Sequence, residues 1–177
     1  STQQSITNQY AIKFYEKIGV NRVVLAREVS YEDLKQIRKT SNLELEYFVH
    51  GAMCVAYSGR CMLSNYYSLR DSNRGGCSQS CRWNCNLYQE VNHKLHRISK
   101  DEEPFSMSSK DLNLALSIPK LMDLGIDSLK IEGRMKSIYY LATIILTYRM
   151  IIDSYYENPN NYVIDDRTID NLSRAAN

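Results

Sequence analysis

Short apolar runs alternate with amphipathic helical patterns along most of this chain, and this alternation constrains the fold more than any other feature. The apolar run at residues 22–26 is followed by a helical pattern after Ser30, and residues 43–49 form the next run. Continuous apolar strands are typical of parallel sheets that are buried on both faces. Strands and helices that alternate with short links are the mark of parallel α/β packing. The sequence therefore predicts an α/β fold.

The same patterns place the individual elements. We expect strands over residues 1–5, 22–26, 43–49, 105–107 and 126–131. Asn8 or Thr7, Ser30, and Ser108 or Ser109 are candidate helix caps. The helix after Ser109 should carry Leu112 and Leu116 as far as Gly125, with a kink or a break at Pro119. A long helix over residues 136–155 and a short one over 165–175 complete the set. The long helix has an apolar face at helical spacing, made of Ile138, Leu141, Ile145, Tyr148 and Ile152.

A cysteine-rich window interrupts the alternation. Residues 52–103 show no sustained period, and we expect an irregular loop followed by a β-hairpin over 86–98 that turns near Asn92. Long irregular loops in compact domains are usually functional. All of the cysteines lie in this window: Cys54, Cys61, Cys77, Cys81 and Cys85. Thiols concentrated in this way can form disulfides, bind zinc or hold an iron–sulfur cluster.

The start of the chain bears on the state of these thiols. The chain opens Ser-Thr-Gln-Gln, without methionine and without a secretory pattern, so we expect a trimmed piece of a longer cytoplasmic protein. Cytosolic thiols stay reduced, which makes disulfides the weaker alternative. The longest apolar run, residues 141–146, is too short to cross a bilayer, and we expect no membrane partner.

Basic residues gather around the cysteines although the net charge of the whole chain is only +2. A basic surface favours an anionic partner such as RNA phosphate or a small carboxylate, although a solvated loop explains the same residues equally well. Aromatic side chains in the window could stack on RNA bases. The candidate RNA-binding residues are Arg60, Arg70, Arg74 and Arg82, with Tyr57, Tyr66, Tyr67 and Trp83 for stacking.

Polar residues follow the expected strands, where ligands bind in parallel α/β folds. Lys130 and Glu132 lie two residues apart on an otherwise apolar strand, so they share one face. Buried charges need partners, which favours a functional cluster over a surface pair. The candidate residues of this substrate mouth are Arg27, Glu28, His50, Lys110, Asp111, Lys130, Glu132 and Arg134.

Several long stretches resemble the U-32 peptidase family, the collagenase-like proteases. They are FVHGAMCVAYSGRCMLSNY, RDSNRGGCSQSCRW, SMSSKDL and GIDSLKIEGRMKSIYYLATIILTYRMIID. The resemblance covers nearly the whole chain. It implies a TIM-barrel-like (β/α) domain of which this chain is the C-terminal half, over residues 1–155, with the cysteine-rich window as an insertion. Residues 156–177 would form a turn and a short helix.

The same resemblance implies an activity. Members of this family hydroxylate pyrimidines in tRNA or rRNA, use prephenate and carry a [4Fe–4S] cluster. Carried over by position, Cys54, Cys61, Cys77 and Cys81 match the ligand pattern of the family, with Cys85 as a possible substitute. We therefore expect an iron–sulfur-dependent RNA hydroxylase. A zinc site and a non-catalytic RNA-binding module remain alternatives.

The family name also suggests proteolysis. Neither the Gly-x-Ser-x-Gly nor the His-Glu-x-x-His motif is present. A Ser–Lys pair among Ser108, Ser109 and Lys110, or a cysteine paired with His50, is a conceivable nucleophile.

Half a barrel would expose strand edges and interior residues. We therefore expect the rest of the barrel, or a second copy in a homodimer, to cover them.

Overall fold

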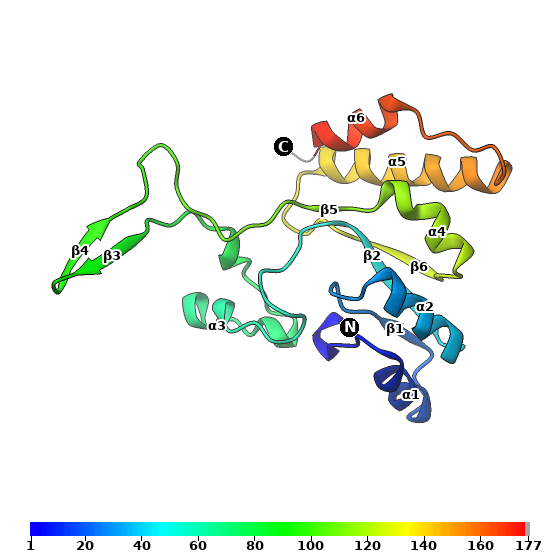
Figure 1. Cartoon of the computed structure of the whole chain (residues 1–177), viewed down its shortest axis with the longest axis horizontal. Coiled ribbons are helices and arrows are strands. Elements are labelled where there is room, and N and C mark those ends of the chain that lie inside the picture. Colours follow the sequence, from blue (N-terminus) through cyan, green and yellow to red (C-terminus); the bar gives the residue numbers. More distant parts are fainter. Residues whose placement is uncertain (176–177) are drawn as a thin grey trace. The chain divides into compact units, whose positions relative to one another are not determined.

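A computed structural model describes residues 1–175, with side chains up to Ser173, and it divides into two compact units. Unit 1 comprises Ser1–Met53 together with the chain from Lys110 onward. Unit 2 comprises Cys54–Ser109. Figure 1 follows the chain from unit 1 through the helix and hairpin of unit 2 and back into unit 1.

The sheet of unit 1 is built around one strand, β2 (Glu44–Gly51). β1 (Arg22–Val24) and β6 (Ser128–Glu132) both run parallel to β2. Glu46 of β2 pairs with Val24 and with Ser128, so β1 and β6 lie on opposite edges of β2. These parallel strands confirm the α/β class.

A short fourth strand, β5 (Leu112–Asn113), joins the end of β2 in the antiparallel direction. Asn113 lies opposite His50, and Leu112 lies opposite Gly51. The chain that leaves β2 at Gly51 is therefore fixed beside the chain that returns from unit 2.

The helices of unit 1 begin where the sequence supplies a side-chain cap. α1 (Gln9–Lys17) follows Asn8, whose Oδ1 accepts hydrogen bonds from the backbone amides of Tyr10 and Ala11 at 3.0 and 3.1 Å. α2 (Tyr31–Thr40) follows Ser30, whose Oγ accepts from the amide of Asp33 at 3.1 Å. These caps satisfy amides that have no partner within the helix.

The remaining helices follow β5 and β6. The 3-10 turn η4 (Ala115–Ser117) leads into α4 (Ile118–Asp123). α5 (Ile138–Glu157) is capped by Ser137, whose Oγ accepts from the amide of Tyr140 at 3.1 Å, and α6 (Asp166–Ala175) packs along it (Figure 1).

One hydrophobic core lies in unit 1 between the sheet and these helices. It includes Leu25 just after β1, Leu45 and Val49 of β2, and Ile144 and Ile151 of α5. Every residue of the core cluster lies within residues 6–49 or 115–172.

Two of the expected strands are not formed as predicted. Residues 1–5 are not a strand: Thr2–Gln4 form the 3-10 turn η1, and Ser5 has φ 51°. This segment is polar and has no alternating apolar residues to bury. The strand expected at residues 105–107 is reduced to a single bridge between Cys85 and Phe105.

The helix expected from residue 108 begins only at Ile118. Leu112, expected on that helix, lies in β5. Pro119 stands in the first turn of α4 rather than inside a helix. Proline has no N–H and a fixed φ, so it is well suited to start a helix.

The apolar face expected for α5 is partly wrong. Tyr148 is buried, but Ile138 and Ile145 are 87% and 55% exposed. The buried side instead contains Tyr140, Ile144 and Ile151 with Tyr148. This helix is apolar nearly all round, so spacing alone does not identify its buried face.

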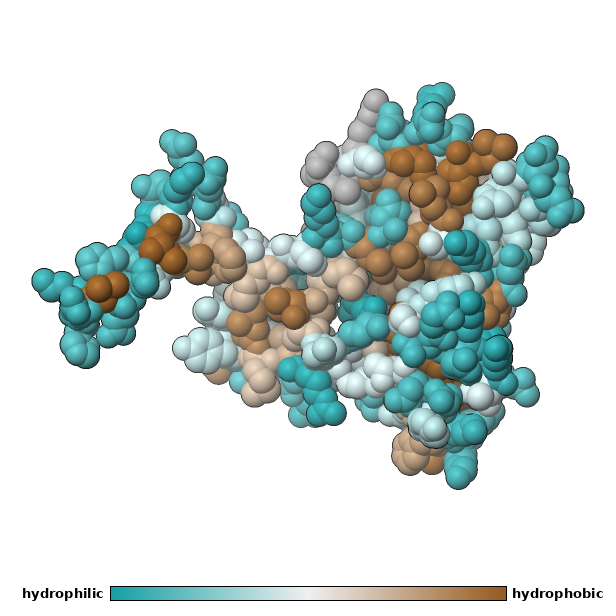
Figure 2. All heavy atoms as spheres, in the orientation of Figure 1, coloured by the Kyte–Doolittle hydropathy of each residue, from teal (hydrophilic) through white to brown (hydrophobic). Residues whose placement is uncertain are grey.

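Unit 2 contains a short helix, two 3-10 turns and a hairpin. These are α3 (Leu63–Ser68), η2 (Ser72–Arg74), η3 (Ser80–Arg82), β3 (Tyr88–Val91) and β4 (Lys94–Arg97). The hairpin is confirmed, with positive φ at both Asn92 and His93, as a two-residue type I′ turn requires. Figure 2 shows the hairpin as mainly hydrophilic, whereas brown and tan atoms gather over the part of unit 2 that includes α3.

Hydroxyl groups join α3 to η3 through a serine network of Ser64, Ser68, Ser78 and Ser80. The Oγ of Ser78 lies 3.0 Å from that of Ser64 and 2.9 Å from that of Ser80. The Oγ of Ser68 donates to Ser78 Oγ at 2.9 Å, and Ser78 N donates to Ser64 Oγ at 3.0 Å.

An amide side chain makes a second link in unit 2. Asn73 accepts from Cys61 N through Oδ1 and donates to Cys61 O through Nδ2, both at 2.9 Å. No apolar side chain within residues 54–109 is fully buried. Unit 2 therefore depends on polar contacts where unit 1 depends on a hydrophobic core.

Within residues 1–175, no helix has both the length and the apolar character needed to cross a membrane.

Gly51 provides a test of the strand pairing. Its φ is +107°, and a Cβ there would lie 2.0 Å from the carbonyl oxygen of Glu132 in β6. We expect Gly51→Ala to lower the free energy of unfolding of unit 1 by at least about 3 kcal/mol, through backbone strain and overlap together. Urea unfolding followed by circular dichroism measures it.

Gly19→Ala is the matched control. Gly19 has φ +82°, and a Cβ there would meet nothing within 4 Å. Only the backbone strain remains, so we expect a loss of about 1 kcal/mol. Equal losses in the two variants would show that the contact between Gly51 and β6 is not as close as described.

Candidate functional site

An irregularity in the pairing of β2 with β6 separates the polar residues at the ends of these strands. Phe48 pairs with Lys130, but the next pair is His50 with Ile131, so Val49 is an extra residue in β2. Such a bulge turns the following side chain to the opposite face. His50 therefore lies on the α5 side of the sheet, while Lys130 lies on the other side with Phe48.

Lys130 belongs to a charged group on the face away from α5. Its Nζ lies 2.5 Å from Glu46 Oε1, and the Glu46 side chain is only 16% exposed. The Lys130 Nζ and the Arg27 guanidinium lie 5.4 and 4.0 Å from the centre of the Phe48 ring. The lysine expected to need a partner thus has one in Glu46, which sequence reasoning did not identify.

A second polar group lies on the α5 side and is formed by Asp111, Lys136 and Tyr140. The Asp111 side chain is 7% exposed, and its Oδ2 accepts from Tyr140 Oη at 2.9 Å and lies 2.6 Å from Lys136 Nζ. Lys136 also lies 4.7 Å from the centre of the Tyr140 ring. Burial, and then the hydrogen bond to Asp111, raise the pKa of Tyr140, which keeps this hydroxyl protonated.

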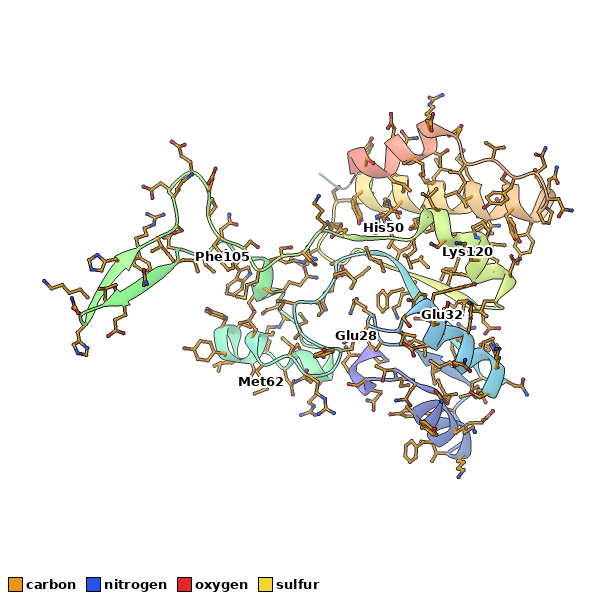
Figure 3. The ribbon with its side chains drawn as sticks, in the orientation of Figure 1. Glu28, Glu32, His50, Met62, Phe105 and Lys120 are labelled. Carbon is orange, nitrogen blue, oxygen red and sulfur yellow. The ribbon has the colours of Figure 1, made fainter. Side chains whose placement is uncertain are left out.

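His50 lies beside this group, at the end of β2 (Figure 3). It is 2% exposed, and its ring contacts those of Tyr140 and Tyr148, with centroids 5.9 and 5.4 Å away. Burial lowers the pKa of His50, the charge of Asp111 opposes this effect, and that of Lys136 adds to it. The imidazole is therefore neutral at pH 7.

Hydrogen bonding fixes which nitrogen of His50 carries the proton. Tyr148 Oη donates to Val49 O at 2.8 Å and accepts from Leu114 N at 3.2 Å, so its single proton is in use. With the Tyr148 proton directed at Val49 O, His50 Nδ1, 3.1 Å from Tyr148 Oη, acts as the donor. The buried Nε2 is left as a bare acceptor, with no hydrogen-bond partner in the structure.

The other residues expected at the substrate mouth are more open. Glu132 Oε1 accepts from the backbone amide of Arg134 at 3.2 Å, across the turn that follows β6. Arg134, Lys110 and Glu28 are exposed. The structure therefore brings His50 and Asp111 together and separates them from Lys130 by the sheet. It adds Lys136, Tyr140 and Tyr148, which a period-two reading of the strands cannot find because they lie on α5 or just before it.

None of the cysteines of unit 2 forms a disulfide. Cys54 is exposed, and the other four are partly buried. Cys77 and Cys61 both lie close enough to Cys81 to raise its pKa. Among the described residues, no group of three or more His, Cys, Asp or Glu side chains is arranged to hold a metal ion.

The neighbours of the thiols give them different acidities. Burial alone would raise the pKa of Cys61, but hydrogen bonds from the Ser64 amide, the Ser72 hydroxyl and the Leu63 amide outweigh it, so this pKa is lowered. Burial raises the pKa of Cys81; Arg82 opposes this, while Cys77 and Cys61 add to it. Cys61 is thus the more readily ionised of the two thiols.

The low pKa of His50 predicts a pH dependence of stability. An unfolded histidine binds a proton near pH 6.5, whereas the folded His50 binds one only at lower pH. Its contribution to stability is complete above pH 6.5 and is lost as the pH falls below it, at up to about 1.4 kcal/mol per pH unit. Urea unfolding between pH 5 and 8 should therefore show a shallower fall for His50→Asn than for the wild type. Parallel curves would contradict this assignment.

Comparison with known proteins relates this geometry to a family. The model of peptidase family U32 matches residues 1–177. The chain is 51% identical to tRNA hydroxylation protein P1 of Bacillus subtilis, over 100% of this chain and 42% of that protein. It is 36% identical to a 23S rRNA 5-hydroxycytidine synthase of Escherichia coli, over 89% of this chain and 23% of that protein.

A relative with a different name is about as similar as the rRNA enzyme. The chain is 35% identical to a protein of Porphyromonas gingivalis named collagenase, over 88% of this chain and 39% of that protein. The chain thus spans less than half the length of the relatives it matches. No solved structure matches it. The match of the family model over the whole chain shows that this protein belongs to peptidase family U32.

Proposed function

We propose that this chain is part of an RNA-modifying hydroxylase that acts on a pyrimidine of tRNA or rRNA. The observation that carries the proposal is the 51% identity, along the whole chain, to a tRNA hydroxylation protein. A second RNA-modifying relative, which acts on 23S rRNA, supports the same class of substrate. The tRNA uridine and the rRNA cytidine are both candidate targets.

The cofactor that we propose is a [4Fe–4S] cluster on Cys54, Cys61, Cys77 and Cys81, with Cys85 as a possible substitute and zinc as the alternative metal. Two observations support a bound group in unit 2. Its cysteines form no disulfide, and it has no fully buried apolar side chain. Small units without a sufficient core usually need a metal or covalent cross-links to be stable. Four thiolates are the donor set of such clusters, which supply one-electron transfer. The four cysteines would have to converge on the cluster, since among the described residues they are not gathered into a metal site.

Unit 1 supplies groups that could bind and orient a substrate. His50 Nε2 can accept a hydrogen bond from a hydroxyl or an amide, because its tautomer is fixed by Tyr148. Arg134 and Lys136 add positive charge after β6. A co-substrate with two carboxylates, such as prephenate, would be complementary to these cations.

A further part of the proposal is the architecture of the complete protein. Parallel β1, β2 and β6 follow one another in the sheet in the same order as in the chain, which is the order of strands in a (β/α) barrel. Among the described residues, β6 pairs only with β2, and an open apolar cavity lies between β6 and α5, lined by Leu129, Ile131 and Ile145 among others. We propose that the remainder of the barrel, or a second copy of the chain, covers this edge. A cytosolic location, where the thiols stay reduced, belongs to the same proposal.

Proteolysis is the second candidate, favoured by the relative named collagenase. It would need an activated serine or cysteine. His50 bonds through Nδ1 to Tyr148, and its Nε2 has no serine or cysteine partner in the structure. Ser108 Oγ donates to the carbonyl of Ser109 at 3.3 Å, which is a local contact and not a link to a base. RNA hydroxylation is therefore the function we prefer.

The cofactor is tested by purification without oxygen. We expect brown protein that contains iron and acid-labile sulfide, both lost in Cys54→Ala or Cys77→Ala because each removes a ligand. Cys85→Ala separates the two ligand sets: it should keep both if the four named cysteines hold the cluster, and lose them if Cys85 is the substitute ligand. Stoichiometric zinc without iron would instead support a structural zinc site.

The reaction is tested on cellular RNA. Deleting the gene for the full-length protein should remove a hydroxylated pyrimidine from bulk tRNA or rRNA, as measured by mass spectrometry of nucleosides. The wild-type gene should restore it, and Cys77→Ala should not. Unchanged nucleosides, together with collagen cleavage that Ser109→Ala or His50→Ala abolishes, would establish the peptidase instead.

A further inference from the structure

Three aromatic rings of unit 2 form a cluster that is open to solvent. Tyr66 and Tyr67 of α3 meet edge to face with centroids 5.2 Å apart, and Tyr67 meets Trp83 with centroids 6.2 Å apart. Tyr66 is 81% exposed, Tyr67 is 49% exposed and Trp83 is 47% exposed. We call these three residues the aromatic cluster.

The backbone around the aromatic cluster is held in place by the serine network. Tyr66 and Tyr67 lie between Ser64 and Ser68 on α3, and Trp83 follows η3, which begins at Ser80. The network joins α3 to η3 through Ser78, with oxygen–oxygen distances of 2.9 to 3.0 Å. These rings are therefore presented on a fixed support, although none of them is buried.

Arginines occur at both ends of the segments that carry the aromatic cluster. Arg60 precedes α3, Arg70 follows it, Arg74 ends η2 and Arg82 directly precedes Trp83. Between Cys54 and Cys85 the only acidic residue is Asp71, whose Oδ1 accepts from Asn73 N at 3.0 Å. The segment that carries the aromatic cluster is therefore strongly cationic.

We propose that the aromatic cluster is a stacking platform for unpaired bases of single-stranded RNA, with the neighbouring arginines on the phosphates. Exposed rings beside cationic side chains are the combination with which proteins hold single strands, because every base has a face that can stack. A protein partner would favour a continuous apolar patch and fewer like charges. That the strand is RNA rests on the proposed function.

Trp83 is the single tryptophan of the chain, so tryptophan fluorescence measures directly whether RNA is bound at the aromatic cluster. A twelve-nucleotide oligouridylate, titrated at low salt into protein purified without oxygen, should quench Trp83 fluorescence saturably. Duplex RNA of the same length should not. Tyr66→Ser should weaken binding by about 5-fold to 150-fold, which is the usual effect of removing one stacked ring. Tyr66→Phe keeps the ring and should bind like the wild type.

Two further variants separate stacking from charge and from general effects. Arg74→Ala should weaken binding. It should also reduce the slope of the logarithm of the binding constant against the logarithm of salt concentration by about 1, since one fewer counterion is released. Tyr156→Ala, at an exposed tyrosine of α5, should change nothing. Because Tyr66 makes no buried contact, its variants should keep the circular dichroism of the wild type.

The proposal is overturned if oligouridylate leaves Trp83 fluorescence unchanged, or if Tyr66→Ser binds like the wild type. It is also overturned if sedimentation shows a dimer that Tyr66→Ser dissociates, since the rings would then be a self-interface. The assay is independent of catalysis. Binding without RNA hydroxylation would refute the proposed function alone, and hydroxylation without ring-dependent binding would refute only the stacking platform.

Discussion

The pairing of β2 with β6 is the interaction on which the rest of unit 1 depends. Every other strand of the sheet pairs with β2, and one extra residue in it, Val49, changes which face the next side chain occupies. A regular β2 would place His50 on the face of Phe48 and Lys130. The bulge instead places it under α5, where Tyr148 fixes its tautomer and Asp111 lies nearby. The chemistry available at this end of the sheet is thus set by a one-residue irregularity of the backbone.

The two units are stabilised by different physical means. Unit 1 buries a continuous hydrophobic core, which contributes about 25 cal/mol for each Å² of apolar surface removed from water. Unit 2 has hydroxyl and amide networks around Ser78 and Asn73, and each such bond contributes only about 1 kcal/mol net. The proposed cluster would make up for this difference, because the binding of a metal group by thiols is itself a contribution to folding.

Much of unit 1 can be predicted from its sequence, because apolar runs and caps such as Asn8 and Ser30 act locally. The hairpin can be predicted from its Asn92–His93 turn for the same reason. What cannot be predicted depends on contacts between distant segments. The bulge at Val49 is visible only in the register with β6, and Glu46 becomes the partner of Lys130 only when these strands pair. Lys136 and Tyr140 join the candidate site through their contacts with Asp111, which precedes Tyr140 by 29 residues in the chain.

The short strand β5 has a consequence for how the protein loses its structure. It fixes Leu112 opposite Gly51, so the two ends of the segment that forms unit 2 are held side by side by unit 1 itself. The entropic cost of closing a loop rises only slowly with its length. A long segment inserted between ends that are already held together therefore lowers the stability of unit 1 only slightly. Unit 2 can therefore open or exchange its amide hydrogens while the sheet of unit 1 stays intact. The chain is in this respect two cooperative systems in one polypeptide, and a single melting temperature would describe neither of them.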